Sequence, residues 1–412
     1  MNPIEVMAPA GNFAALTAAA QGGADAVYFG VGELNMRAHA ANNFDVDDLP
    51  EIAAFCNASK MRSYLTLNTI LYDRDMEEME RILAKAKEAQ LSAVIASDMA
   101  AILAARAYGL EVHISTQLNV SNLQSLKFFS QFADVVVLAR ELTLPQIKTI
   151  AQGIQREEIK GPSGNLVKLE LFCHGALCMA ISGKCYLSLH HYHASANRGS
   201  CYQLCRRAYL VTDKETGHQL EIDQEYIMSP KDLSTIPFID KILDTGVEVL
   251  KIEGRARAPE YVKCVTQVYK QGVHAYLNGQ FTPQLGAQLQ QTLETVFNRG
   301  FWDGYYQGAK MGEWSEVYGN KATQRKEYLG KVTNYFNNLG VAEVLLETGA
   351  LYTGDSLFII GPTTGVVEQT VPEIRLELQP VTSAPKGSYC SIKVDGLVRR
   401  GDKVFKIYAP VF

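Results

Sequence analysis

The chain has 412 residues, which predicts two or three domains of about 150 residues each. Its composition, 47% hydrophobic and 20% charged, is ordinary for a globular protein with a large core. The 39 Lys and Arg against 44 Asp and Glu give a net charge of −5. This charge excludes polyanion binding by bulk positive charge and leaves room only for a local basic face.

The sequence contains neither a membrane-spanning segment nor a signal peptide, and this indicates its cellular compartment. Every apolar run is shorter than the roughly 18 residues of a membrane helix, which excludes an integral membrane protein. The first residues, MNPIEVMAPAG, have neither a basic start nor an apolar stretch of signal-peptide length, so we expect a cytoplasmic protein. Eight cysteines in 412 residues are too sparse for a disulfide scaffold.

Short apolar runs alternate with helix-like stretches over most of the chain. In Val135–Ala139 polar and apolar residues do not alternate, so both faces of the strand should be buried, as in a parallel sheet covered by helices. Between the runs, Met76–Gln90 carries an apolar stripe at helical spacing. The strand-like runs are Ile4–Ala8, Ala26–Phe29, Tyr64–Leu67, Ala93–Ala96, Val112–Ser115, Val135–Ala139, Leu169–Phe172 and Val249–Ile252.

Repeated strand-and-helix units predict an α/β fold, and eight of them fit a (β/α)8 TIM-like barrel. A ninth strand-like run, Tyr226–Ser229, means that one segment has to lie outside the barrel. We place the barrel at residues 1–310, with a cysteine-rich insertion at residues 173–224, where helical periodicity is weak.

The composition changes after residue 310. Residues 311–327 are polar and predict a linker. From residue 328 to residue 412, short strands are separated by turn residues such as Gly361-Pro362 and Asp395-Gly396. This spacing is typical of a small all-β barrel domain.

The cysteines are distributed unevenly. In a chain without an export signal, clustered thiols indicate a metal site rather than disulfides, and soft thiolates suit zinc or an iron–sulfur cluster. Structural zinc usually has gaps of about two to four residues within each cysteine pair, and only the second pair here has one. The wider first gap favours an iron–sulfur cluster and leaves zinc as the alternative. The clustered residues, in the pattern C-x6-C-x15-C-x3-C, are Cys178, Cys185, Cys201 and Cys205.

Polar side chains stand at the carboxyl ends of several predicted strands, where barrel enzymes place their chemistry. Arg140 and Arg255 predict a clamp on a dicarboxylate, because a guanidinium binds a carboxylate through two parallel hydrogen bonds. Glu141 and Glu253 are either catalytic groups or structural ion-pair partners of these arginines. Further candidates for substrate binding are Lys251, Gln117 and Asn68.

His174 lies four residues before the first clustered cysteine. It is either a catalytic proton donor beside the metal site or a buried histidine whose ring is satisfied by hydrogen bonds. The sequence leaves both interpretations open.

Several segments together resemble peptidase family U32, the collagenase-like family. The segment ELFCHGALCMAISGKCYLS at Glu170–Ser188 is similar to the signature of the family, and NRGSCYQLCRR at Asn197–Arg207 is similar to its continuation. GADAVYFG at Gly23–Gly30 and LKIEGR at Leu250–Arg255 also match, in the order typical of the family.

The resemblance implies a redox activity on RNA. In its length and its expected C-terminal β-barrel, the chain resembles those family members that hydroxylate the 5-position of the wobble uridine of tRNA. These proteins use prephenate and act independently of oxygen. Family members bind a 4Fe–4S cluster, which by position would be held here by Cys178, Cys185, Cys201 and Cys205. Prephenate would be the dicarboxylate bound by Arg140 and Arg255, and an electron donor that no motif identifies would also be required.

Two alternatives remain open. One is a collagenase-like, metal-dependent peptidase, although H-E-x-x-H and G-x-S-x-G motifs are absent. The other is a non-catalytic accessory protein in which the metal only stabilises the insertion.

Binding of tRNA would require a local basic face. Arg198, Arg206 and Arg207 lie beside the cysteines, and Tyr202 and Tyr209 alternate with them in a pattern able to stack bases. Further basic candidates are Arg255, Arg257, Arg399, Arg400 and Lys403.

Overall fold

The computed structural model describes residues 4–39, 43–178, 180–181, 183–207, 209–222, 229–308, 312–315 and 319–408. Residues 226–228 of the expected ninth strand therefore lie outside the described residues. The same holds for residues 311 and 316–318 of the expected linker and residues 409–412 of the expected C-terminal domain.

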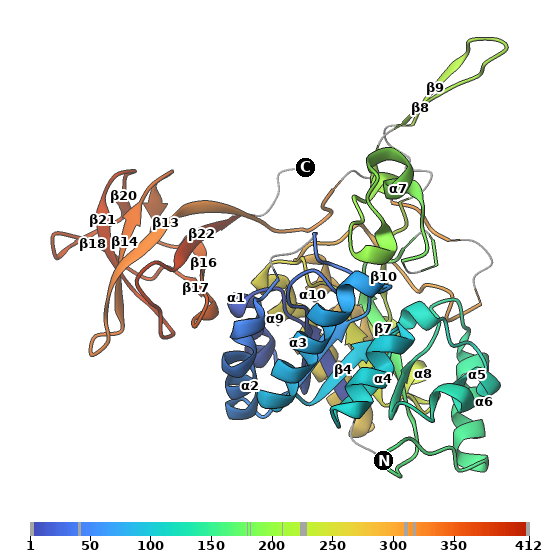
Figure 1. Cartoon of the computed structure of the whole chain (residues 1–412). Helices are drawn as coiled ribbons and strands as arrows, with labels where there is room; N and C mark the ends of the chain where they lie inside the picture. Colours follow the sequence, from blue (N-terminus) through green and yellow to red (C-terminus); the bar gives the residue numbers. More distant parts are fainter. Residues whose placement is uncertain are drawn as a thin grey trace.

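Eight parallel strands form a closed barrel (Figure 1). Each strand from β1 to β7 pairs with the next along the chain, and β11 pairs with both β7 and β1, which closes the ring. The predicted TIM-like barrel is confirmed, since all eight predicted runs overlap its strands. They are β1 (Glu5–Pro9), β2 (Ala26–Phe29), β3 (Arg62–Leu67), β4 (Ala93–Ala96), β5 (Glu111–Ile114), β6 (Val135–Val137), β7 (Lys168–Gly175) and β11 (Val249–Ile252).

Helices surround the barrel and cover its strands with apolar side chains. In α3 the predicted stripe is confirmed, because Met79, Ile82, Leu83 and Ala86 are buried. Side-chain caps fix several helix starts, as where Asn12 accepts a hydrogen bond from the Ala15 amide. The helices are α1 (Phe13–Gln21), α2 (Leu49–Ala58), α3 (Met76–Glu88), α4 (Met99–Ala107), α5 (Leu123–Phe129), α6 (Leu144–Arg156), α8 (Ile239–Leu243), α9 (Pro259–Leu277) and α10 (Pro283–Glu294).

The regular alternation breaks between β7 and β11. This segment contains the short helix α7 (Leu187–Tyr192) and a hairpin of β8 (Tyr209–Thr212) and β9 (Gln219–Ile222), which stand above one end of the barrel (Figure 1). Strand β10 (Asp232–Ser234) then pairs antiparallel with the end of β7, and β12 (Phe301–Trp302) pairs with β10. The additional strand thus lies outside the barrel and begins after the expected Tyr226–Ser229 run, whose described residue Ser229 is in no strand.

The C-terminal part is antiparallel and all-β, as predicted, and has its own apolar core. Its sheet order is β17-β16-β22-β13-β14-β21-β18-β19, with β15 (Leu351–Tyr352) and β20 (Ser383–Ala384) paired separately. The sheet contains β13 (Arg325–Phe336), β14 (Val341–Leu346), β16 (Ser356–Gly361), β17 (Gly365–Thr370), β18 (Ile374–Leu376), β19 (Gln379–Val381), β21 (Tyr389–Lys393) and β22 (Lys403–Tyr408).

This sheet docks on the barrel through β17, which lies against α1 (Figure 1). The side chain of Gln21 donates to the Thr364 carbonyl and accepts from the Val366 amide, both at 2.9 Å. Lys263 of α9 donates to the Val366 carbonyl at 3.0 Å. In the described part of the chain, no helix has the length and apolar character that crossing a membrane requires.

Candidate active site

A cavity of about 240 Å³ opens at the carboxyl end of the barrel, between the strand ends and the cysteine-rich segment. Its wall combines residues from β2, β3, β7 and β11 with residues of the loops that follow the strands. Barrel enzymes place their active sites at this end. The predicted site residues that line the cavity are Asn68, Gln117, Arg140, Cys178, Cys185, Cys201, Cys205, Lys251, Glu253 and Arg255.

His174 and Glu141 are not among the residues that line this cavity. Glu141 is exposed and lines a smaller neighbouring cavity beside Arg140 and Cys178. His174 is buried, and its ring lies 5.6 Å from that of Tyr269 and 5.4 Å from that of Phe301.

His174 is therefore unsuited to donate a proton at neutral pH. Burial, with a further contribution from the charge of Arg257, lowers its pKa to about 3. A β-bulge at Lys251–Ile252 changes the register between β11 and β7 beside this residue. A bulge interrupts the alternation of side chains, so the strand-end rule does not place His174 in the cavity.

Arg140 and Arg255 face the cavity without carboxylate partners. Arg140 Nη1 donates to the Ala176 carbonyl at 3.0 Å, and its guanidinium lies 3.8 Å from the centre of the Phe172 ring. Arg255 Nη1 donates to Thr66 Oγ1 at 2.8 Å. Among the described residues neither arginine forms an ion pair within 4 Å, and Arg140 Nε has no hydrogen-bond partner.

Both guanidinium groups keep their charge despite burial. Burial lowers the pKa of Arg255 to about 10 and also lowers the pKa of Arg140. An arginine guanidinium stays protonated in proteins at neutral pH. A buried cation without a counter-ion is energetically unfavourable, and a bound anion would remove that cost. This geometry makes the cavity a candidate anion-binding site.

Glu253 has a partner that the sequence analysis missed. Its Oε1 lies 2.7 Å from Nη2 of Arg37, in the loop after β2. Burial alone would raise the pKa of Glu253, but the charges of Arg37, Arg257 and Arg140 hold it at about 2. Glu253 is therefore an ionised structural partner of Arg37. The strand-end rule missed Arg37 because it lies eight residues beyond the end of β2.

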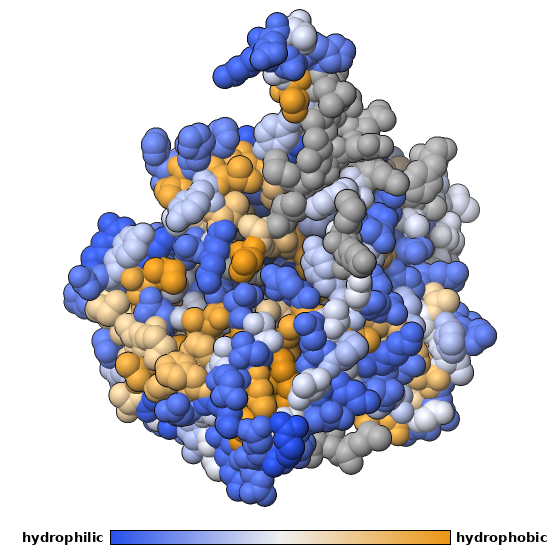
Figure 2. Space-filling model, turned by 90° about the vertical axis from the view of Figure 1, so that its right-hand side faces the viewer, coloured by the Kyte–Doolittle hydropathy of each residue, from blue (hydrophilic) through white to orange (hydrophobic). Residues whose placement is uncertain are grey.

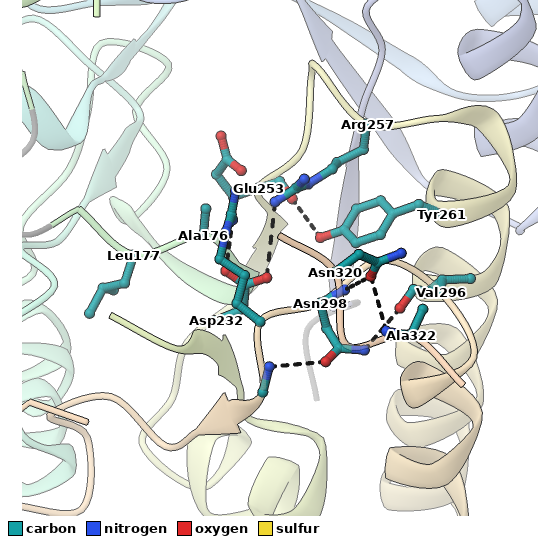
Figure 3. A network of polar contacts seen from close by, with 12 residues as sticks. Ala176, Leu177, Asp232, Glu253, Arg257, Tyr261, Val296, Asn298, Asn320 and Ala322 are labelled. Carbon is teal, nitrogen blue, oxygen red and sulfur yellow. Dashed lines mark hydrogen bonds and ion pairs between the residues drawn. The ribbon is translucent and has the colours of Figure 1, made fainter. Parts of the chain in front are cut away.

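A second carboxylate, Asp232, neutralises two further arginines. Its oxygens lie 4.0 Å from Arg257 Nη2 and 3.4 Å from Arg299 Nη1. Figure 3 shows Arg257 directed toward Asp232, and the Tyr261 hydroxyl donating to the Glu253 carbonyl at 2.9 Å. Sequence reasoning did not identify Asp232 as a site residue, since it belongs to the strand outside the barrel.

The remaining cations complete the charge balance of the wall. Lys251 Nζ pairs with Glu170 Oε1 at 2.6 Å. Arg206 donates to the Leu177 carbonyl at 2.9 Å and to Ser229 Oγ at 3.1 Å. Seven cations line the cavity, and three carboxylates pair with four of them. The arginines without a carboxylate partner are Arg140, Arg206 and Arg255.

The four clustered cysteines line the same cavity. Burial raises the pKa of Cys205 to about 11, and the charges of Cys178, Cys201 and Cys185 act in the same direction. In the described residues, no three His, Cys, Asp or Glu side chains are already close enough to bind one metal ion. Thiols are the donor type that iron–sulfur clusters use, so these four cysteines fit such a group in kind.

The other cysteines differ from these four. Cys56 and Cys390 are buried in apolar cores, and the thiol of Cys173 donates to the Lys251 carbonyl at 3.4 Å. Their environment is that of packing residues.

Known proteins similar to this chain are named for two different activities, collagen cleavage and RNA hydroxylation. A collagenase of Porphyromonas gingivalis is 54% identical over 98% of both chains. A tRNA hydroxylation protein of Bacillus subtilis is 30% identical, over 90% of this chain and 86% of that one. An Escherichia coli 23S rRNA 5-hydroxycytidine synthase is 33% identical, over 75% of this chain and 46% of that one.

Two further comparisons concern the family and the solved structures. A solved U32 peptidase has a TM-score of 0.40 and 12% identity, covering 61% of this chain and 93% of that one. The model of peptidase family U32 matches residues 11–316. The resemblance noted in the cysteine segment is confirmed, and the chain belongs to peptidase family U32.

Proposed function

We propose that this protein is an RNA-modifying enzyme that hydroxylates the wobble uridine of tRNA at the 5-position, using prephenate and independent of oxygen. A 4Fe–4S cluster would be held by Cys178, Cys185, Cys201 and Cys205. The observation that carries the proposal is a cavity in which arginines without a carboxylate partner, Arg140 and Arg255, line the same space as four thiols. Relatives named for RNA hydroxylation give it further support.

Arg140 and Arg255 would bind the two carboxylates of prephenate. Within the described residues each forms a single hydrogen bond to the protein and has further guanidinium N–H groups to offer. Charge-assisted bonds to carboxylate are about twice as strong as neutral ones. The Phe172 ring under Arg140 holds that guanidinium in place and excludes water from one face. When bound, the cluster would supply electrons or bind an oxygen-bearing group beside the substrate.

The cysteine-rich segment supplies a surface suited to RNA. Its first part, residues 173–212, contains four Lys and Arg and no Asp or Glu, so this part carries +4 and the rest of the chain −9. Tyr186, Tyr192 and Tyr202 are exposed by 78%, 48% and 53%, and the last two rings lie 5.3 Å apart. Arg207 donates to the Tyr192 hydroxyl at 2.7 Å. Exposed aromatic rings interleaved with cations bind unpaired bases.

Other parts of the expected basic face are turned elsewhere. Arg198 pairs with Asp75, Arg206 points into the cavity, and the Tyr209 hydroxyl donates to the Leu204 carbonyl. The hairpin β8–β9 carries Asp213, Lys214, Glu215 and Glu221 and is acidic, and Figure 2 shows hydrophilic residues at its tip. We therefore assign RNA binding to the tyrosine surface and not to the hairpin.

The test is the tRNA of cells that lack this gene. We expect 5-hydroxyuridine-derived nucleosides to disappear from its mass spectrum, to return with the wild-type gene, and to stay absent with Arg140→Met. The matched control is Arg375→Met, an exposed arginine of the C-terminal sheet that pairs with Glu373. An unchanged nucleoside profile in the deletion strain would contradict the proposal.

A second candidate is a collagenase-like, metal-dependent peptidase, which the name of the 54% identical relative favours. It predicts that anaerobically purified protein cleaves gelatin and that a chelator stops the cleavage. Iron and sulfide analysis of the same preparation separates a cluster from zinc. Colourless, zinc-loaded protein that folds only with its metal would favour the non-catalytic accessory role.

A further inference from the structure

A chain of titratable side chains runs through the interior of the barrel. At the cavity, Lys251 Nζ of β11 lies 2.6 Å from Glu170 Oε1 of β7. The other oxygen, Glu170 Oε2, lies 3.7 Å from His113 Nδ1 of β5. On the far side of the ring, His113 Nε2 lies 3.1 Å from Glu111 Oε1. Glu111 pairs in turn with Arg62 at 2.7 Å.

The two ends of this chain reach opposite ends of the barrel. Lys251 lines the cavity, whereas the side chains of Glu111 and Arg62 are 30% and 38% exposed where β5 and β3 begin. Between them, the side chains of Glu170 and His113 are fully buried. Barrel interiors are usually filled by apolar residues, so a buried ionic chain that spans one calls for a function.

The signs of the charges single out His113 as the variable member. Lys251 and Arg62, at the two ends, are cations, and Glu170 and Glu111 are anions on either side of His113. Glu5 adds a last carboxylate 3.9 Å from Arg62. With neutral His113 these groups sum to −1, and with protonated His113 they sum to zero.

The other groups around His113 fit this balance. The Tyr64 ring packs 4.6 Å from the imidazole, and its hydroxyl donates to Glu5 at 2.9 Å. Burial alone would lower the pKa of His113, but the hydrogen bond to Glu111 and the charges of Glu111 and Glu170 raise it above its ordinary value.

One link of the chain is open. His113 Nδ1 and Glu170 Oε2 are both buried without a hydrogen-bond partner in the described part of the protein. Their separation of 3.7 Å exceeds a hydrogen bond by about 0.7 Å, which a small side-chain movement covers. A donor and an acceptor that face each other across such a gap are suited to exchange a proton intermittently.

We propose that this chain is a proton relay that connects solvent at the amino-terminal end of the barrel with Lys251 in the cavity. A proton from water passes through Glu111 to His113 Nε2, and His113 releases its Nδ1 proton to Glu170. Glu170 reprotonates Lys251 after the Lys251 ammonium has given its proton to a ligand in the cavity. The net change is one proton moved from solvent to the ligand.

The relay matters most when the cavity mouth is covered. A macromolecular substrate over the mouth would block water from that side, and the path from the opposite end would stay open. The inference concerns the same cavity as the proposed function, but it does not require that the reaction be RNA hydroxylation.

Nuclear magnetic resonance of ring-¹⁵N-labelled histidine tests the coupling directly. We expect His113, assigned with His113→Gln, to titrate between about pH 5 and 9. Lys251→Met removes a cation and should raise the midpoint by about one pH unit or more, while Glu170→Gln removes an anion and should lower it. The matched control is Lys263→Met, which removes a lysine of α9 that is not part of the relay and should leave the midpoint of His113 unchanged.

Two results would overturn the relay: a His113 ring that keeps one protonation state over this range, or a midpoint that neither variant moves. If Glu170→Gln fails to fold, Lys251→Met, at the cavity edge, decides the test alone. The signals of the other seven histidines report folding in each variant.

Turnover provides the second measurement. In anaerobic RNA hydroxylation, His113→Gln should lower kcat at least tenfold and leave KM for RNA unchanged, whereas a merely structural role would change both or neither. Wild-type protein that is inactive on RNA but shows the coupled His113 titration would contradict the proposed function and support the relay.

Discussion

The barrel and the C-terminal sheet treat their buried polar groups in opposite ways. In the sheet, buried polar side chains are satisfied: Gln369 donates to the Lys393 carbonyl at 2.8 Å, and Asp402 accepts from Thr364 and from the Arg399 amide. Among the described residues, every buried side-chain nitrogen or oxygen that lacks a hydrogen-bond partner belongs to the barrel part, between residues 69 and 302.

The C-terminal sheet pairs its buried polar groups, which favours stability, whereas the barrel leaves some unpaired, as a site that receives a ligand would. Native proteins leave few buried polar atoms unpaired, and each exception calls for an explanation. Arg140 Nε faces the cavity, and His113 Nδ1 and Glu170 Oε2 face each other below it. The sheet has no such groups among its described residues, which fits a supporting role beside α1 and α9.

The sharpest contrast is between the cysteines of the two parts. Cys178→Ser should remove the visible absorption and the bound iron of anaerobically purified protein and leave the fold intact, because Cys178 is exposed. Cys390→Ser should keep the absorption and lower the melting temperature, because it places a hydroxyl in an apolar core. Full iron content in Cys178→Ser would exclude this thiol as a ligand.

Acid should weaken the barrel before the sheet. The pKa of Glu253, about 2 in the folded protein against 4.5 as the ordinary value, stabilises the fold above pH 4.5, and this stability is lost as the pH falls toward 2. Its size is on the order of 3 kcal/mol. Denaturant unfolding between these pH values should therefore become less pH-dependent in Glu253→Gln.

The control for this pH dependence lies in the sheet. Glu347 pairs with Lys331 at 2.9 Å on the exposed side of the sheet. Exposed pairs contribute little, so Glu347→Gln should leave the acid dependence of unfolding unchanged. Equal effects of the two substitutions would remove the electrostatic distinction between the two parts.

The sequence specifies the regular parts of this molecule more fully than its site. Unbroken apolar runs predict the barrel strands because strands buried on both faces need no alternation, and turn residues predict the all-β tail. The four cysteines line one cavity, since the insertion that carries them folds over the carboxyl end of the strands. Their convergence on one metal centre stays a prediction, because no three of the described ligand side chains are close enough to bind one ion.

The contacts between distant segments could not be predicted. Arg37 meets Glu253 across 216 positions of sequence, and only barrel closure brings β2 and β11 to the same opening. Glu170 and His113 lie within apolar strands, where periodicity marks them as exceptions but cannot pair them. The sequence could not decide between a cavity and a buried position for His174, because the bulge beside it has no signal in the sequence.

Arg255 tests whether an unpaired buried charge belongs to a ligand. Arg255→Met should weaken prephenate binding about 10- to 100-fold, since a hydrogen bond to a charged group contributes about 1.5–3 kcal/mol. It should leave the melting temperature unchanged or raise it, because the arginine has no carboxylate partner in the described structure. Calorimetry measures both quantities, with Arg375→Met as the control in the sheet. A large drop in melting temperature would show that Arg255 is structural.

The smallest effect is expected where the two parts meet. Gln21→Ala removes one hydrogen bond to Val366 of β17 and one to Thr364 just before it, each worth about 1 kcal/mol, at a position where the glutamine is exposed. Hydrogen exchange at the Val366 amide, which loses its acceptor, should become faster, while prephenate affinity stays the same. If affinity falls together with the protection of this amide, the sheet helps to shape the cavity, and the division between a supporting and a binding part fails.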